Sequence, residues 1–165
     1  MYIKVKNFVF RIVYLLILLY LIIFIPKFWG YSPLVVISNS MSPTLKVGGI
    51  LYYSEEMIEN YDRGDILVYE VPEHIISHRI VDQTNKGYVT KGDSNNTIDS
   101  KVVEYNQVLG KGTNWSIPYI GYYADFVYNH KYLLFISVAM ILLDLFNDYY
   151  KNHKKKVVIR NEKSN

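Results

Sequence analysis

An unbroken apolar run, Ile12 to Ile25, lies near the start of the chain and ends at Pro26 and Lys27. With Phe8 to Phe10 added, and with the Arg11 side chain extending toward the lipid headgroups, the segment has about 18 residues. A helix needs about 20 apolar residues to cross a bilayer. The segment therefore predicts a membrane-spanning helix and leaves only the rest of the chain for a folded domain.

A cleavable signal peptide is the alternative interpretation of this segment. Such a peptide is followed by a small-x-small cleavage site. Here the run continues as Ile25-Pro26-Lys27-Phe28-Trp29, which contains no such site. Aromatic residues at this position, including Tyr31, are typical of the belt where a span leaves the bilayer. We therefore expect a retained anchor.

A second apolar segment, Tyr132 to Leu143, lies near the other end of the chain. With Leu145 and Phe146 it has about 15 residues, which make about 22 Å of helix. The hydrocarbon core is about 30 Å thick, so a span requires the helix to continue past Lys131 and Asp144 or the bilayer to thin. An interfacial or packed helix is the alternative, and we expect a second span.

Basic residues gather outside both apolar segments, and the net charge is +3. These residues are Lys4, Lys6, Arg11, Lys151, Lys154, Lys155, Lys156, Arg160 and Lys163. Lys and Arg are enriched on the cytoplasmic side of membrane spans, so two spans with both termini in the cytoplasm explain the pattern. Nucleic-acid binding is the alternative, but the basic tail lacks interleaved aromatics and an accompanying fold, so no nucleic-acid partner is expected.

The chain has no cysteine. Cysteine-protease chemistry, thiolate zinc sites and disulfides are therefore excluded. A domain outside the cytoplasm would depend on its hydrophobic core alone for stability.

Residues 32 to about 129 show the pattern of β structure, with no long helical periodicity and no internal repeat. Short runs rich in β-branched and aromatic residues are Leu34–Ile37, Ile50–Tyr53, Ile66–Tyr69 and Ile75–Val81. Turns are indicated at Gly48-Gly49, Arg63-Gly64-Asp65 and Asn85-Lys86-Gly87, the last joining Ile80-Val81 to Tyr88-Val89-Thr90 in a hairpin.

These patterns predict a mostly β fold: a compact antiparallel β domain with an N-terminal transmembrane helix and a C-terminal one. The expected boundaries are 1–31 for the basic tail and anchor, and 32–129 for the extracytoplasmic β domain. Residues 130–150 form the second membrane helix, and 151–165 the basic cytoplasmic tail.

Ser40 lies shortly after the first apolar run. Serine is a poor nucleophile unless a base takes its proton and dipoles receive the oxyanion. Two histidines, His74 and His78, lie between the apolar segments, whereas His130 adjoins the second segment and His153 lies in the basic tail. His78 is favoured as the base because it lies inside a β-like run, which holds a side chain more rigidly than a loop.

The segment from Gly92 to Asp99 contains the carboxylates Asp93 and Asp99. Glycine, aspartate and asparagine at this density ordinarily form a turn. A carboxylate in such a loop could also orient an imidazole and stabilise its charged form. Spacing does not choose between the two aspartates. A metal site is a further alternative, but the carboxylates are few and no second acidic cluster accompanies them.

Four segments in this order resemble signal peptidase I, in the branch that uses serine and histidine. That branch is found in the endoplasmic reticulum, in archaea and in some Gram-positive bacteria. The resemblance extends from the first apolar segment to about Gly121. The matching segments are Ser38-Asn39-Ser40-Met41-Ser42-Pro43-Thr44-Leu45, Gly64-Asp65-Ile66-Leu67-Val68-Tyr69, His78-Arg79-Ile80 and Lys91-Gly92-Asp93 through Asp99.

The resemblance implies that Ser40 is the nucleophile, His78 the general base and Asp99 the residue that orients the histidine. The main bacterial branch carries lysine where His78 stands, which implies the other mechanism for this chain.

Supporting roles are also implied. Asp93 matches a second acidic position and is expected to pair with Arg79, and the Ser40 N–H with the Ser38 hydroxyl is expected to form the oxyanion hole. Ser94 departs from the asparagine common in the family.

The function implied is a membrane-bound serine endopeptidase that removes signal peptides from exported preproteins, without a cofactor or metal. The expected setting is the cell membrane, with two spans and the catalytic domain on the extracytoplasmic side. Preproteins, the lipid bilayer and the export translocon are the expected partners. A peptidase dedicated to one or a few secreted proteins and a non-catalytic membrane scaffold are the alternatives.

Overall fold

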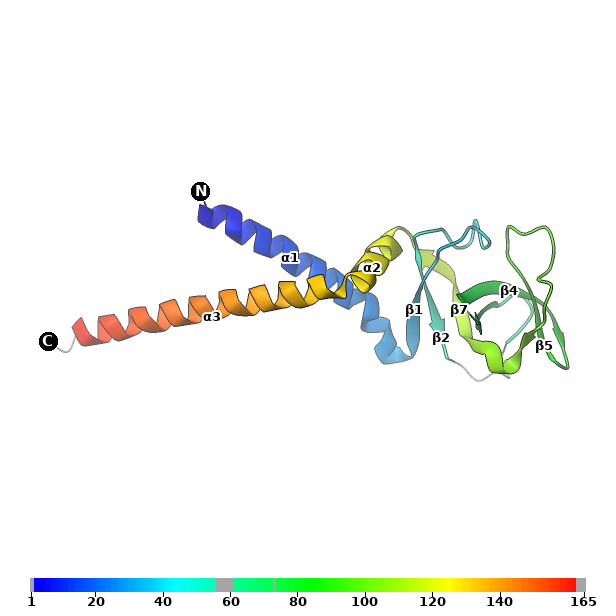
Figure 1. Cartoon of the computed structure of the whole chain (residues 1–165). Coiled ribbons are helices and arrows are strands. Elements are labelled where there is room, and N and C mark those ends of the chain that lie inside the picture. Colours follow the sequence, from blue (N-terminus) through cyan, green and yellow to red (C-terminus); the bar gives the residue numbers. More distant parts are fainter. Residues whose placement is uncertain (1, 56–60, 73, 163–165) are drawn as a thin grey trace. The chain divides into compact units, whose positions relative to one another are not determined.

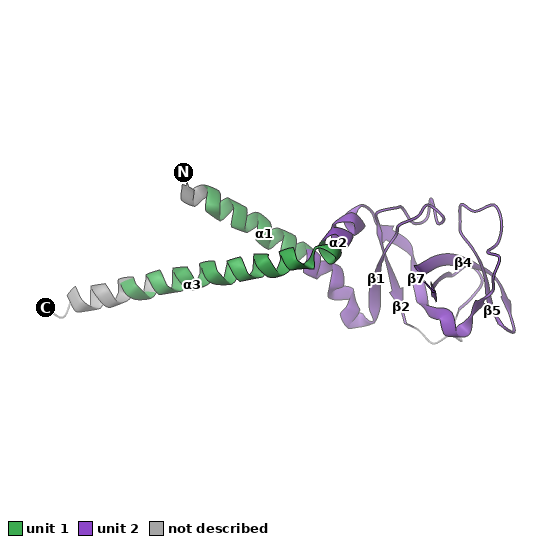
Figure 2. Cartoon of the chain, viewed as in Figure 1, with its two compact units in different colours: residues 1–19, 127–165 green, residues 20–126 purple. Residues whose placement is uncertain are grey.

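The structure is a computed structural model that describes residues 2–55, 61–72 and 74–162. The chain divides into two compact units (Figure 2). One unit comprises Met1–Leu19 with Val127–Asn165, and the other is Tyr20–Phe126. The candidate site lies entirely in the second unit.

Within the described residues, seven strands form one antiparallel sheet with the order β1-β2-β7-β3-β4-β5-β6 (Figure 1). The predicted fold class is therefore confirmed. The strands are β1 (Tyr31–Val35), β2 (Ile50–Ser54), β3 (Ile66–Val71), β4 (His74–Thr84), β5 (Gly87–Lys91), β6 (Val103–Glu104) and β7 (Val108–Ile117).

Side chains from both faces of the sheet form hydrophobic clusters. Leu51, Ile66 and Val68 pack with the segment after β1, whereas Leu67 and Tyr88 belong to a second cluster. Successive residues of a strand point to opposite faces, so β3, which lies between β7 and β4, contributes to both clusters. An unbroken apolar run such as Ile66–Tyr69 is the sequence pattern expected for a strand buried on both faces.

The predicted Leu34–Ile37 strand is displaced, because β1 ends at Val35. Val36 still exchanges backbone hydrogen bonds with the Gly48–Gly49 turn, and then the chain leaves the sheet. Ile37 is 77% exposed, since it lies on the segment that leads to Ser40. The predicted hairpin between β4 and β5 is present.

Strand β7 and helix α2 (Ile120–Asn129) are the longest of the elements that were not predicted. Strand β7 is interrupted by polar residues and by Gly110 and Gly112, so it lacks an apolar run. Gly110 lies where a Cβ would overlap the carbonyl of Ser54, which explains glycine in a strand interior. Helix α2 lies in the part of the chain expected to be β structure.

Among the described residues, two apolar helices are long enough to cross a membrane. Helix α1 (Tyr2–Phe24) leads into the short 3-10 helix η1 (Ile25–Trp29), and the candidate span Val5–Trp29 has a mean hydropathy of 2.8. Helix α3 (Lys131–Glu162) contains the second candidate, Lys131–Lys151, with a mean hydropathy of 1.5. At 1.5 Å per residue the second candidate is about 32 Å long. It reaches this length because the helix continues past Asp144.

Within the first unit, the two candidate spans are joined by an ion pair. Lys6 of α1 donates a hydrogen bond to Asp144 of α3. Charged side chains in membrane helices are costly unless they are paired or reach the interface. The pairing explains how a carboxylate is accommodated inside the second candidate span.

Candidate active site

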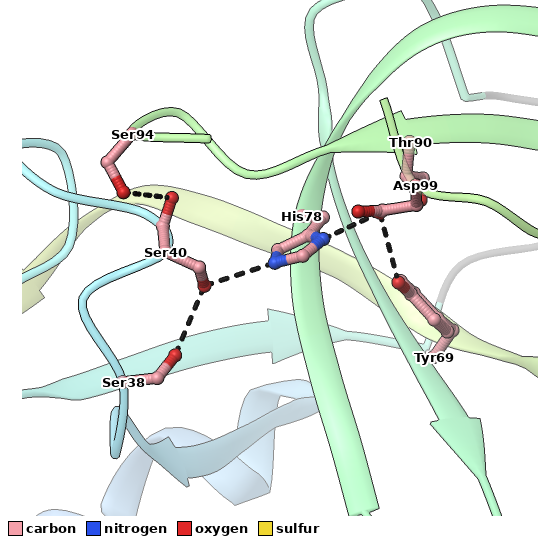
Figure 3. A network of polar contacts seen from close by, with 7 residues as sticks. All are labelled: Ser38, Ser40, Tyr69, His78, Thr90, Ser94 and Asp99. Carbon is pink, nitrogen blue, oxygen red and sulfur yellow. Dashed lines mark hydrogen bonds and ion pairs between the residues drawn. The ribbon is translucent and has the colours of Figure 1, made fainter. Parts of the chain in front are cut away.

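Ser40, His78 and Asp99 form a chain of hydrogen bonds (Figure 3). Ser40 Oγ lies 3.0 Å from His78 Nε2, and His78 Nδ1 lies 2.6 Å from Asp99 Oδ2. An ionised carboxylate accepts hydrogen bonds only, so Nδ1 carries a proton and donates it toward Asp99. In the neutral imidazole, Nε2 is then the acceptor and points at the serine hydroxyl.

The sheet holds the histidine rigidly. His78 lies in β4 opposite Leu67 of β3, and only 9% of its surface is exposed. Ser40 and Asp99 both come from segments without strand structure, on either side of the imidazole (Figure 3). His78, the histidine inside the predicted strand, is therefore the one that lies beside Ser40. His74 instead lies at the start of β4 and lines a groove.

The segment that carries Ser40 is tied to the loop after β5. The backbone N–H of Ser94 donates to the Ser40 carbonyl at 2.9 Å, and its hydroxyl lies 3.0 Å from the same oxygen and 2.7 Å from the Asn39 carbonyl. Gly92 packs so closely on this segment that a Cβ would come within 2.7 Å of the Ser40 carbonyl oxygen. Ser94 therefore fixes the backbone of the candidate nucleophile, which explains how serine fits at this position.

Asp93 pairs with Arg79 as expected. Arg79 Nε and Nη2 donate to the two carboxylate oxygens at 2.8 and 2.7 Å, and Thr44 Oγ1 donates at 2.5 Å. The Arg79 hydrogen bonds lower the pKa of Asp93 below its usual value, and the same hydrogen bonds raise the pKa of Arg79. The ion pair joins β4 to the loop after β5, and the Thr44 hydrogen bond connects the segment of Ser40 to the same carboxylate.

We expect Asp93→Asn to destabilise the protein by about 2 kcal/mol at pH 7, because Arg79 then lacks its charged partner. The pKa of Asp93 is lowered by folding, so its stabilisation is fully present above the ordinary aspartate pKa of about 3.9. It is lost as the pH falls through the lowered value. Urea unfolding of the detergent-solubilised chain at pH 7 and pH 3 measures the free energy of unfolding. The difference in this free energy between Asp93→Asn and wild type should be smaller at pH 3.

The exposed Asp82 in β4 provides a matched control, since Asp82→Asn removes the same charge from the same sheet. It should leave the stability nearly unchanged at both pH values. An Asp93→Asn cost that is equal at pH 7 and pH 3 would contradict the ion-pair explanation.

Ser38 lies next to the candidate nucleophile, with its Oγ 3.1 Å from Ser40 Oγ. A groove of about 330 Å³ opens beside both hydroxyls, between the end of β1 with the following segment and the first half of β4. Its lining residues are Leu34, Val35, Val36, Ile37, Ser38, Ser40, Met41, His74, Ile75, Ile76, Ser77 and His78.

Two residues near Asp99 were not predicted. Thr90 Oγ1 donates to Asp99 Oδ2 at 2.7 Å, and Tyr69 Oη donates to the same oxygen at 3.4 Å. Burial raises the pKa of Tyr69 to about 12, so its hydroxyl remains protonated at neutral pH. Both lie in strands that were predicted from their apolar character, and that pattern contains no signal for a polar contact.

A serine hydroxyl, an imidazole and a carboxylate joined in this order match the arrangement of serine hydrolases. No known family profile matches the chain. The chain is, however, 30% identical over 99 residues to signal peptidase I W of Bacillus subtilis (strain 168), covering 56% of this chain and 52% of that protein. The chain spans only about half the length of this relative.

Proposed function

We propose that this chain is a membrane-bound signal peptidase of the serine/histidine branch, which removes N-terminal signal peptides from exported preproteins. The observation that carries the proposal is the placement of His78, with Ser40 at 3.0 Å on one ring nitrogen and Asp99 at 2.6 Å on the other. The similarity to signal peptidase I W supports the substrate class.

In the proposed reaction, His78 Nε2 takes the proton of Ser40 as Oγ attacks the carbonyl carbon before the scissile bond. Asp99 stabilises the imidazolium and keeps Nε2 directed at the serine. The imidazolium then gives its proton to the leaving amine, which frees the mature protein. Water, activated by the same imidazole, hydrolyses the acyl-enzyme and restores the Ser40 hydroxyl.

The negative oxygen of the tetrahedral intermediate requires hydrogen-bond donors. We assign this role to the Ser40 N–H and the Ser38 hydroxyl, whose Oγ lies 3.1 Å from the attacking oxygen. The groove beside these hydroxyls is mainly apolar, and it would hold the residues of an extended peptide next to the cleavage site.

The two candidate spans support a reaction that takes place at a membrane. A signal peptide is itself an apolar helix, and its cleavage site emerges at the bilayer surface. An enzyme anchored in the same bilayer meets that site at a high effective concentration. We infer a multi-pass chain with its β domain on the extracytoplasmic side, where it would act on preproteins delivered by the export translocon.

Cleavage of a signal-bearing precursor by membranes that contain the full chain tests the activity. Mass spectrometry of the product should give one new N-terminus directly after the signal peptide, and membranes without the chain should give none. A survey of uncleaved precursors after depletion then separates a general enzyme from one dedicated to a few secreted proteins. Failure of the wild-type chain to cleave any signal-bearing precursor would favour the scaffold alternative.

The proposed topology predicts which residues reagents can reach from outside the cell. The chain contains no cysteine, so Lys86→Cys in the β4–β5 turn and Lys154→Cys in the basic tail each introduce a single thiol at an exposed position. We expect a membrane-impermeant maleimide to label the Lys86 variant in intact cells, or in protoplasts if a wall is present. The Lys154 variant should be labelled only after permeabilisation. Labelling of both in intact cells would contradict the two-span topology.

A further inference from the structure

Asp99 lies on a loop that does little to orient its own side chain. The residue has no regular secondary structure, and its neighbours Ile98 and Ser100 are exposed. The carboxylate must nevertheless stay within 2.6 Å of His78 Nδ1 to orient the imidazole. Other groups therefore have to hold it in place.

The sheet supplies these groups from neighbouring strands. His78 lies in β4, Thr90 in β5 and Tyr69 in β3, and the strand order is β3-β4-β5. Ile76 and Ile80 lie two residues on either side of His78, so all three share one face of β4. Tyr69 is opposite Ile76 and Thr90 is opposite Ile80, which puts both hydroxyl groups on that face as well (Figure 3).

Thr90 holds Asp99 at two points. Its carbonyl accepts the backbone N–H of Asp99 at 2.9 Å, and its hydroxyl donates to Asp99 Oδ2 at 2.7 Å. Thr90 is completely buried, and Tyr69 is 5% exposed, so neither hydroxyl is readily replaced by solvent. Valine has nearly the same shape as threonine and would fill a buried strand position equally well. A buried threonine therefore indicates that its hydroxyl makes a needed hydrogen bond.

We propose that Thr90 is a positioning residue for the cleavage reaction, with its hydroxyl holding the Asp99 carboxylate against His78 and Tyr69 giving weaker support. The inference rests on the proposed function. All three donors, from β3, β4 and β5, meet the same carboxylate oxygen. Loss of the Thr90 hydroxyl leaves Asp99 free to turn away from the imidazole.

The test compares Thr90→Val and Thr90→Ser in the full chain, reconstituted in liposomes, with a signal-bearing precursor under single-turnover conditions. Valine keeps the shape and removes the hydroxyl, and serine keeps the hydroxyl. We expect Thr90→Val to lower the cleavage rate at saturating enzyme by about tenfold. The enzyme concentration that gives half of the maximal rate should not change. Thr90→Ser should stay within about twofold of wild type, and Tyr69→Phe should lose about threefold.

A double-mutant cycle with Asp99→Ala shows whether Thr90 acts through Asp99. In that background Thr90→Val should cost less than about twofold, because no carboxylate remains to be held. A folding defect would instead lower the rate in both backgrounds. An equal loss in both, or no loss in the wild-type background while Asp99→Ala is impaired, would overturn the proposal.

Two further outcomes separate this inference from the proposed function. If Asp99→Ala cleaves as fast as wild type while Ser40→Ala is inactive, the positioning proposal fails and the peptidase assignment survives. If Ser40→Ala cleaves normally, the proposed function itself fails.

Discussion

Ser40→Ala should abolish cleavage of a signal-bearing precursor, with a rate loss of roughly 10⁴- to 10⁶-fold. The variant removes the oxygen that would form the ester bond of the acyl-enzyme. No other residue of the hydrogen-bonded chain can form that ester in its place. His78→Ala should cause a loss of similar size, since Ser40 Oγ then lacks the base that lies 3.0 Å away. Because the two residues act as one unit, the double variant should be scarcely slower than either single variant.

Ser42→Ala is the matched control for the nucleophile. It removes the same atom from the same segment, and we expect it to retain most of the wild-type rate. The rates are measured with excess enzyme in membranes, so that residual cleavage over hours is visible. Cleavage by Ser40→Ala at even a tenth of the wild-type rate would rule out Ser40 as the nucleophile.

Asp99→Ala should lower the cleavage rate by roughly 10³- to 10⁴-fold while substrate binding changes little. The carboxylate accepts a hydrogen bond from His78 Nδ1 at 2.6 Å. Without it, the tautomer and the orientation of the ring that direct Nε2 at Ser40 are no longer fixed. Asp93 has a different environment, because both of its oxygens accept hydrogen bonds from Arg79. The larger loss of cleavage rate should therefore belong to Asp99, and the larger loss of stability to Asp93.

Urea unfolding and single-turnover cleavage of Asp99→Ala and Asp93→Asn, measured on the same preparations, distinguish the two carboxylates. The reverse result, with Asp93→Asn slower than Asp99→Ala and equally stable, would assign the orienting role to Asp93.

The elements that could be predicted are those with a local cause. The run Ile66–Tyr69 is apolar at every position and becomes the buried strand β3. The segment Ile12–Ile25 is long and apolar and becomes most of helix α1. Strand β7 could not be found in this way, because its place between β2 and β3 is set by backbone pairing with partners far away in the chain.

The candidate site shows the same division. The sequence by itself supplied Ser40 and His78 as the candidate nucleophile and base. The resemblance of its motif singled out the serine, and a place inside a β-like run favoured the histidine. Spacing alone did not distinguish the roles of Asp93 and Asp99. Only the tertiary structure shows that Asp93 pairs with Arg79 and that Asp99 pairs with His78. The contact of Thr90 with Asp99 could be recognised only in the tertiary structure. A hydrogen bond acts over about 3 Å, and only the pairing of β3, β4 and β5 brings side chains from three distant segments within that distance of one oxygen.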